Sequence, residues 1–218
     1  MASKKVIFWQ VDAQEDFMTP GGKLYVPGAE KLLHNIRRLT DAARQGRVLL
    51  VSHGCIHTKD DPEFAQFPPH CIQETPGARL VPEALTEKYV TVRNDPAVKL
   101  PADLEPFHQI LLEKQTLDIF ESHHAEALLD RLPRDAEFIV FGVVTEYCVR
   151  LAAKGLLERG RRVAVVSDAI ETLNPAEARR TMKELTALGA ETITTNDALR
   201  RLDHTATAET KSRAPSGS

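Results

Sequence analysis

Short apolar runs rich in β-branched residues alternate along this chain with longer amphipathic stretches. The apolar runs cover residues 6–11, 48–51, 89–92, 110–112, 138–141 and 163–166. Apolar residues at helical spacing fill residues 29–45, 125–132, 148–159 and 175–188, the last introduced by Asn174-Pro175 as N-cap and first-turn proline. Strands that alternate with helices pair in parallel through right-handed crossovers. The sequence therefore predicts a three-layer α/β/α sandwich around a central, mostly parallel sheet.

The length of 218 residues suits one α/β domain, which we place at residues 1–202. Residues 203–218 are polar, small and contain Pro, Gly and Ser, so we expect a disordered tail there. The formal net charge of −3 argues against nucleic acid as a partner, because binding to phosphate backbones needs clustered Lys and Arg. The sequence leaves open whether the protein forms a homo-oligomer, because no stripe of surface residues indicates an oligomer interface.

Composition also bears on where the protein works. The chain has no run of about 20 apolar residues that would span a bilayer, and its start has no signal-peptide pattern. Its three cysteines are an odd number in a mid-sized chain, which favours free thiols over a disulfide framework. We therefore expect a cytoplasmic protein with no membrane partner.

The stretch from His53 to Val81 is too irregular for a helix and too long for a plain connection. It contains the breakers Pro68-Pro69 and Pro76-Gly77. Long loops of this kind commonly carry function. We expect this one to build the wall of a site.

Chemically complementary residues end several of the predicted strands. Asp12 follows the first run, Lys114 follows the fourth, and Cys148 comes shortly after the fifth. In a parallel sheet ligands bind outside the carboxyl ends of the strands, so an acid, a base and a thiol are predicted to converge there. Each residue considered alone has a non-functional alternative: Asp12 could cap the end of a strand, Lys114 could be a solvated surface charge, and Cys148 could be a small buried apolar residue.

Cys148 is predicted to lie near the first turn of a helix that begins directly after a strand. The helix dipole and a nearby Lys114 ammonium would favour a thiolate there. The backbone amides of Cys148 and of the turn at residues 143–145 are placed to face a developing oxyanion. A covalent cysteine mechanism becomes the working hypothesis.

Four motifs resemble those of the isochorismatase-like cysteine hydrolases, and within them the nicotinamidase branch. They read VDAQEDFMTPGGKLYVPGA, FPPHCIQETPGA, LLEKQTLDIF and GVVTEYCV, within a match from about Val6 to Asp197. The resemblance implies that Asp12, Lys114 and Cys148 form the catalytic triad. It further implies an isochorismatase-like fold, and a non-proline cis peptide between Val144 and Thr145.

The resemblance also assigns binding roles. It implies that the amides of Val144 and Cys148 form the oxyanion hole. Phe17 and Phe67 would line the pocket in which nicotinamidases stack a flat pyridine ring. Core packing is the alternative for each phenylalanine taken alone.

The metal motif departs from the family pattern, because Cys55 stands where nicotinamidases commonly have aspartate. The corresponding ligands here are His57, Glu63 and His70, with Cys55 as a candidate fourth. These types suit a divalent metal such as Zn²⁺, and two loop histidines with no metal are the alternative. His53 and Asp61 are spare candidates.

The resulting hypothesis is a C–N hydrolase of a small planar amide, with nicotinamide to nicotinate plus ammonia as the leading reaction and a role in NAD salvage. No organic cofactor is required. The alternatives are a related amidase, a carbamoyl hydrolase, an isochorismatase with another substrate, and a non-catalytic binding protein on the same fold. An isochorismatase normally lacks the nucleophilic cysteine, so Cys148 counts against it.

Overall fold

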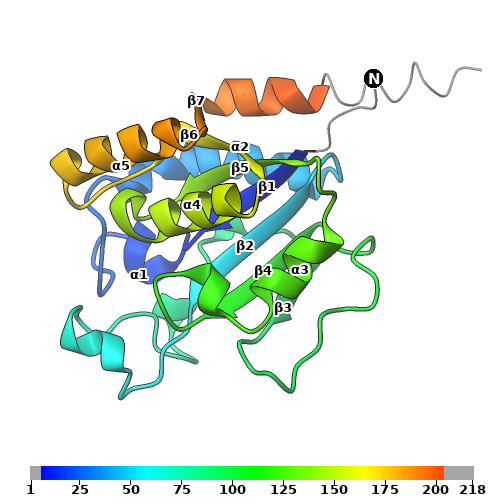
Figure 1. The fold of residues 1–218 in the computed structure, drawn as a ribbon. Helices are drawn as coiled ribbons and strands as arrows, with labels where there is room; N and C mark the ends of the chain where they lie inside the picture. Colours follow the sequence, from blue (N-terminus) through cyan, green and yellow to red (C-terminus); the bar gives the residue numbers. More distant parts are fainter. Residues whose placement is uncertain (1–5, 204–218) are drawn as a thin grey trace, which may run out of the picture.

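The computed structural model describes residues 6–203. Its centre is a seven-stranded sheet in the order β3-β4-β2-β1-β5-β6-β7. Every pairing between neighbouring strands is parallel. Helices cover the sheet on both faces (Figure 1), which confirms the predicted three-layer α/β/α sandwich.

Strands and helices follow one another along residues 6–203. The strands are β1 Val6–Val11, β2 Leu49–Cys55, β3 Tyr89–Val92, β4 Gln109–Lys114, β5 Glu137–Gly142, β6 Arg162–Ile170 and β7 Glu191–Ile193. The α-helices are α1 Glu15–Met18, α2 Leu33–Arg44, α3 Ala125–Arg131, α4 Arg150–Glu158 and α5 Pro175–Ala187. Single 3₁₀ turns cover Ala29–Leu32, Pro62–Ala65, Pro76–Ala78, Pro82–Ala84 and Ile119–Glu121, and a π-helix covers Thr145–Val149. One more helix spans residues 195–203.

The expected strands and helices are present, and the differences lie mainly at their ends. The Asn174 side chain caps α5 by accepting hydrogen bonds from the amides of Ala176 and Glu177, as its sequence pattern predicts. Strand β7 and the helix at residues 195–203 were not predicted. Strand β7 has three residues, two of them exposed, so no apolar run marks it.

Consecutive residues of β1 pack into opposite layers. Phe8 belongs to the core beneath α2, which also contains Ile36 and Leu39. Trp9 belongs to the core beneath α3 and α4, which also contains Leu128. Because side chains alternate across a strand, one buried central strand fills both layers. Figure 1 shows α3 and α4 in front of the strands and α2 behind them.

Two further sequence predictions concern a disordered tail at residues 203–218 and the absence of a membrane-spanning segment. Asp203 ends the helix at residues 195–203, and residues 204–218 of the expected disordered tail lie outside the described residues. Among residues 6–203, no helix is long and apolar enough to cross a membrane.

The connectivity creates a crevice beside β1. The chain passes from β1 to β2 on one side and returns much later as β5 on the other side. Loops that leave the carboxyl ends of β1 and β5 therefore diverge, which is where open α/β sheets bind ligands. The long loop after β2 returns to this end of β1, because the amide of Glu15 donates to the carbonyl of Arg79 and that of Val81 to the carbonyl of Ala13.

Gly142 ends β5 where the chain passes directly against β1. Its φ is 123°, and an added Cβ would lie 2.0 Å from the carbonyl oxygen of Val11. We expect Gly142→Ala to lower the free energy of unfolding by roughly 3 kcal/mol or more, because backbone strain adds to a clash with a backbone atom. Urea unfolding measures this loss.

Gly160→Ala is the matched control for this prediction. Gly160 also has a positive φ, of 69°, but an added Cβ would meet nothing within 4 Å. Its expected loss is about 1 kcal/mol, from backbone strain alone. Equal losses at the two glycines would contradict the close approach at Gly142.

Candidate active site

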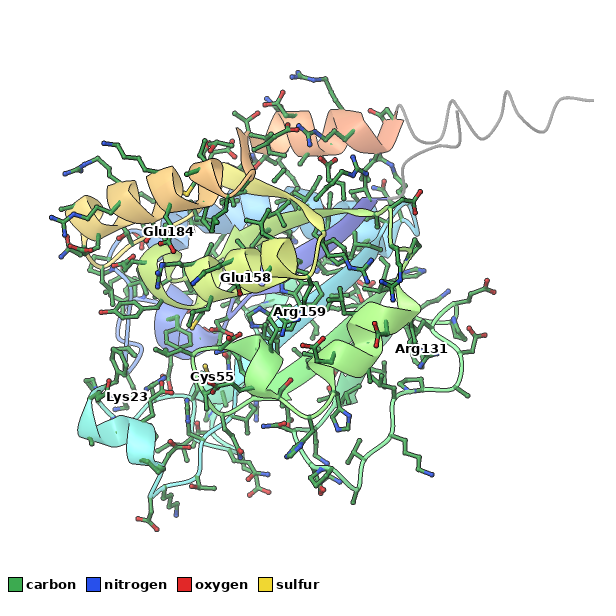
Figure 2. The ribbon with its side chains drawn as sticks, viewed as in Figure 1. Lys23, Cys55, Arg131, Glu158, Arg159 and Glu184 are labelled. Carbon is green, nitrogen blue, oxygen red and sulfur yellow. The ribbon has the colours of Figure 1, made fainter. Side chains whose placement is uncertain are left out.

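The predicted site residues converge at the carboxyl edge of the sheet. Asp12 directly follows β1, Cys55 ends β2, Lys114 ends β4, and Cys148 lies in the π-helix after β5. Cys55 and Lys114 are direct register partners on neighbouring strands. Figure 2 labels Cys55 at the end of the strands that faces the loop after β2. The structure thus brings Asp12, Lys114 and Cys148 together, as the sequence predicted.

The ammonium group of Lys114 is the centre of this cluster. Its Nζ lies 3.0 Å from Asp12 Oδ2, 2.9 Å from Cys55 Sγ and 3.5 Å from Cys148 Sγ. It also donates to the carbonyl of Thr116 at 3.0 Å. Burial of Lys114 opposes its charged form, but the charges of Asp12 and the two sulfurs outweigh burial and raise the pKa of the lysine. Lys114 is therefore a buried cation.

His53 on β2 contacts both the backbone and the side chain of Asp12. The backbone of Asp12 has a φ of 45°, and its amide donates to the carbonyl of His53 at 3.0 Å. The side chains also meet, with His53 Nδ1 3.1 Å from Asp12 Oδ1. His53 was a spare metal candidate in the sequence, but its side chain contacts Asp12 instead of the metal-ligand cluster.

The two thiols share their environment. The contact with Cys148 holds the pKa of the Cys55 thiol well below its usual range; burial opposes this shift and the Lys114 ammonium supports it. The same contact with Cys55, together with burial, raises the pKa of the Cys148 thiol. Both shifts favour a thiolate on Cys55 over one on Cys148. The sequence predicted a Cys148 thiolate; the substitution at position 55 places a second sulfur closer to Lys114.

The turn before Cys148 offers one free amide. The amide of Val143 donates to the carbonyl of Val11 and that of Thr145 to the carbonyl of Glu171. Within the part of the chain that the structure describes, the amide of Val144 donates to no backbone carbonyl. Val144 is therefore the residue of this turn whose N–H is available to an oxyanion.

The position of the cis peptide corrects a sequence expectation. The cis bond joins Val143 to Val144, whereas the family resemblance implied Val144 and Thr145. Thr145 is already the first residue of the π-helix, and both its amide and its hydroxyl donate to the carbonyl of Glu171. The turn therefore falls one residue earlier.

A second cluster, which could hold a metal, adjoins the first. The ligand atoms of Cys55, His57 and His70 all lie within 4.8 Å of one another, and all three residues are buried. Glu63 Oε1 lies 3.7 Å from His70 Nε2 and 3.9 Å from His57 Nε2. Asp61, the other spare candidate, lies behind the cluster with Oδ2 3.0 Å from His57 Nδ1.

The hydrogen bonding of these residues fits a cation. His70 Nδ1 contacts the carbonyl of Pro68 at 2.8 Å, so this nitrogen carries the proton and Nε2 keeps its lone pair. His57 Nδ1 is paired with Asp61 Oδ2, which leaves His57 Nε2, also buried, as the ring nitrogen on the side of Glu63. One thiolate, two imidazoles and a carboxylate are ligand types of Zn²⁺.

The residues of this cluster shift one another's pKa values. Burial lowers the pKa of His57, but the contact with the Cys55 thiolate and the carboxylates of Asp61 and Glu63 outweigh it, so the pKa is raised to about 9. Burial and the Cys55 charge raise the pKa of Glu63. Without a metal, a proton on His57 therefore balances part of the negative charge.

An apolar cavity opens over both sulfurs. Phe17, Phe67 and Val144, all named from the sequence, line it beside Cys55, Glu63, His70 and Cys148. Sequence reasoning missed four further lining residues: Leu24, Leu117, Tyr147 and Leu173. The first three lie inside the quoted motifs, which was a usable signal, whereas Leu173 lies in none. The cavity wall is therefore aromatic and aliphatic, as expected for a flat, apolar ligand.

The comparisons with known proteins agree with this geometry. The model of the isochorismatase domain matches residues 7–197. The chain belongs to the isochorismatase family. The resemblance and the isochorismatase-like fold are both confirmed.

Relatives of this isochorismatase-family protein include amide hydrolases. It is 25% identical to the nicotinamidase of Escherichia coli over 211 residues, covering 86% of this chain and 93% of that one. It is 24% identical to the maleamate amidohydrolase of Pseudomonas putida over 203 residues, covering 93% and 89%. A pyrazinamidase of Pyrococcus horikoshii solved in complex with zinc has a TM-score of 0.68 and 26% identity, covering 87% and 99%. The predicted C–N hydrolase agrees with these relatives.

The shared charge of the two thiols predicts the reactivity of Cys148. We expect Cys55→Ser to move the alkylation of Cys148 to lower pH, because it removes the contact that raises the Cys148 pKa and leaves Lys114 to favour the thiolate. The rate of iodoacetamide labelling of the peptide containing Cys148 measures this across pH, in chelator-treated protein.

Cys71→Ser is the matched control, because Cys71 is also a free, buried cysteine whose thiol donates to the carbonyl of Gly77, whereas the hydrogen bonds of Lys114 Nζ go to Cys55, Thr116 and Cys148. Its labelling profile at Cys148 should follow that of the unsubstituted protein. An unshifted profile in Cys55→Ser would contradict the coupling of the two sulfurs.

Proposed function

We propose that this protein is a cysteine-dependent hydrolase of a small, neutral, planar amide, with nicotinamide to nicotinate plus ammonia as its reaction. The observation that carries the proposal is the lining of the cavity over Cys148. Its walls are aromatic and aliphatic, and its lining residues include no lysine or arginine. The apolar character of this lining suits an uncharged aromatic ring, and the cavity of about 20 Å³ widens on binding to admit one.

The charge of the lining separates two candidate substrates. A substrate that carries a carboxylate needs a cationic side chain to replace its hydration, and arginine usually provides it. The residues that line this cavity include no such cationic side chain. Nicotinamide is neutral and maleamate is an anion, so the lining favours the activity of the Escherichia coli relative over that of the Pseudomonas putida relative.

The ring has stacking partners in this cavity. Phe67 and Tyr147 meet edge to face with ring centroids 5.7 Å apart, and Phe17 lies 5.2 Å from the ring of His70. A pyridine ring held among these aromatic groups can present its amide to Cys148. Phe17 and Phe67 are accordingly proposed as substrate-binding residues.

The buried side chains of Asp12, Lys114 and Cys148 carry out the proposed chemistry. Asp12 takes the proton of the Cys148 thiol, and the sulfur attacks the amide carbon. The amides of Val144 and Cys148 donate to the resulting oxyanion. Asp12 returns the proton to the departing nitrogen, which leaves as ammonia, and the acyl group remains on sulfur as a thioester.

The second half of the reaction restores the protein. Asp12 takes one proton from water, whose oxygen attacks the thioester carbon, and Cys148 leaves as the thiol with that proton. The second proton of the water passes to solvent as the acid departs as nicotinate. Lys114 lies 3.0 Å from Asp12 and 3.5 Å from Cys148, so it stabilises negative charge on either group throughout. No organic cofactor takes part in this scheme.

A divalent metal completes the proposed site. His57, Glu63 and His70 would hold it, and the Cys55 thiolate would supply a further bond. When bound, it would orient the substrate by coordinating the pyridine nitrogen. The zinc-bound pyrazinamidase and the cluster of Cys55, His57 and His70 support this assignment.

The proposal includes a reducing compartment, the cytoplasm, as the site of action. All three cysteines are free and buried, and none forms a disulfide. Free thiols that serve as nucleophile and metal ligand need reducing conditions to remain available.

Ammonia release from a panel of amides tests the function. The panel contains nicotinamide, pyrazinamide, benzamide, maleamate and N-carbamoylsarcosine. We expect turnover of the first two, no turnover of the two anions, and loss of at least about 1,000-fold in kcat in Cys148→Ala, since the nucleophile is gone. Cys71→Ala is the control for loss of a buried thiol and should retain activity.

Two outcomes of this panel would overturn the proposal. Preferential turnover of maleamate would replace neutral amides by anionic ones as the substrate class. Residual activity above about a tenth in pure, folded Cys148→Ala would exclude the covalent mechanism.

Metal content is a separate prediction. We expect protein purified without chelator to contain about one equivalent of divalent metal, and His70→Ala to lose most of it, because one of two imidazole ligands is removed. Elemental analysis by mass spectrometry measures the content. His34→Ala, at an exposed position on α2, is the control. Less than about a tenth of an equivalent in the unsubstituted protein would rule out the site.

A further inference from the structure

His53 is a fully buried histidine for which the proposed mechanism has no use. It lies on β2 as the register partner of Val11, with a side-chain exposure of 0%. Its carbonyl accepts the amide of Asp12, and its Nδ1 lies 3.1 Å from Asp12 Oδ1. One residue therefore holds both the backbone and the carboxylate of Asp12.

The two oxygens of Asp12 face different partners. Oδ1 meets His53 on β2, whereas Oδ2 meets Lys114 on β4 at 3.0 Å and lies 3.8 Å from Cys55 Sγ. A carboxylate held through Oδ2 alone could still rotate about its terminal torsion, which is a soft, broad one. A second contact at Oδ1 removes that freedom and keeps Oδ2 directed toward Lys114, the group that also contacts Cys148.

The surroundings of the imidazole decide which nitrogen donates. His53 Nε2 is buried without a hydrogen-bond partner among residues 6–203. The Trp9 ring packs beside it, with centroids 6.2 Å apart. A proton on Nε2 would be a buried donor without an acceptor, which is costly. The proton therefore resides on Nδ1, which donates to Asp12.

We propose that His53 is a positioning residue that holds the Asp12 carboxylate in the orientation needed for proton transfer with Cys148. It is not among the residues that line the cavity, and the side-chain contact that links it to the site is the one to Asp12, so it acts through Asp12. This inference rests on the proposed function, since it concerns the same general base. The opposing explanation is that His53 only fills space beneath Trp9.

Two substitutions separate these explanations. In His53→Asn the amide nitrogen takes the place of Nδ1 and can donate to Asp12 Oδ1, whereas His53→Leu fills space but donates nothing. We expect kcat on nicotinamide to fall roughly 10- to 100-fold in His53→Leu, the range for loss of a hydrogen bond to a charged group. KM should stay within about twofold of the unsubstituted value, because His53 lies outside the cavity, and His53→Asn should recover most of the kcat.

A second readout needs no substrate. The rate of alkylation of Cys148 by iodoacetamide, followed on the peptide at residues 135–150, should fall in His53→Leu and recover in His53→Asn. It tests the positioning of Asp12 even if nicotinamide is not hydrolysed, so failure of the proposed function would be distinguishable from failure of this inference. Thermal unfolding verifies that each variant is folded.

Each result of these assays either supports or overturns the positioning role of His53. Recovery by asparagine with loss in leucine supports the positioning role in either assay. Equal effects of the two substitutions, or unchanged kcat and labelling in His53→Leu, would overturn it. If His53→Leu does not fold, His53→Gln takes its place, because its longer side chain carries the donor away from the Nδ1 position; full activity of His53→Gln would then also overturn the inference.

Discussion

The buried ammonium of Lys114 is the interaction on which the rest of the site depends. An ammonium ion removed from water is strongly destabilised unless opposite charge lies against it. Asp12 directly after β1 and Cys55 at the end of β2 provide that charge, and the Cys148 sulfur in the π-helix after β5 also lies beside the ammonium. These elements meet because β1 lies between β2 and β5 in a parallel sheet, so the charge cluster depends on the fold.

Cys55 changes the balance of this cluster. Its sulfur lies closer to Lys114 than that of Cys148 does, and it also borders His57 and His70. One side chain therefore joins the lysine cluster to the cluster of metal-ligand type. An aspartate would bring a permanent charge to this position, whereas a thiol shares its charge with Cys148. The pKa of the Cys148 thiol and the state of the second cluster are consequently linked.

Positioning in this site is achieved by pairs of contacts. Asp12 is held by His53 through one oxygen and by Lys114 through the other. The turn before Cys148 is fixed on both sides, by the bond from Val143 to Val11 and by the bonds from Thr145 to Glu171, which leaves the Val144 amide free. Asp12 and the turn are thus each held by at least one partner outside the proposed chemistry, as preorganised sites require.

The sequence alone determined the layers, the parallel sheet and the positions of Asp12, Lys114 and Cys148. Apolar periodicity identifies buried strands, and residues at the carboxyl ends of parallel strands must share one edge. Strand β7 and the helix at residues 195–203 escaped this reasoning, because a short, half-exposed strand has no apolar run.

Only the tertiary structure decided how the side chains of the site meet. It turned His53 toward Asp12, placed Cys55 nearest to Lys114 and brought Leu173 into the cavity wall. Periodicity reports which face of an element is buried, but these contacts join residues far apart in the chain. They depend on distances of a few ångströms that the packing of the sheet and its loops sets.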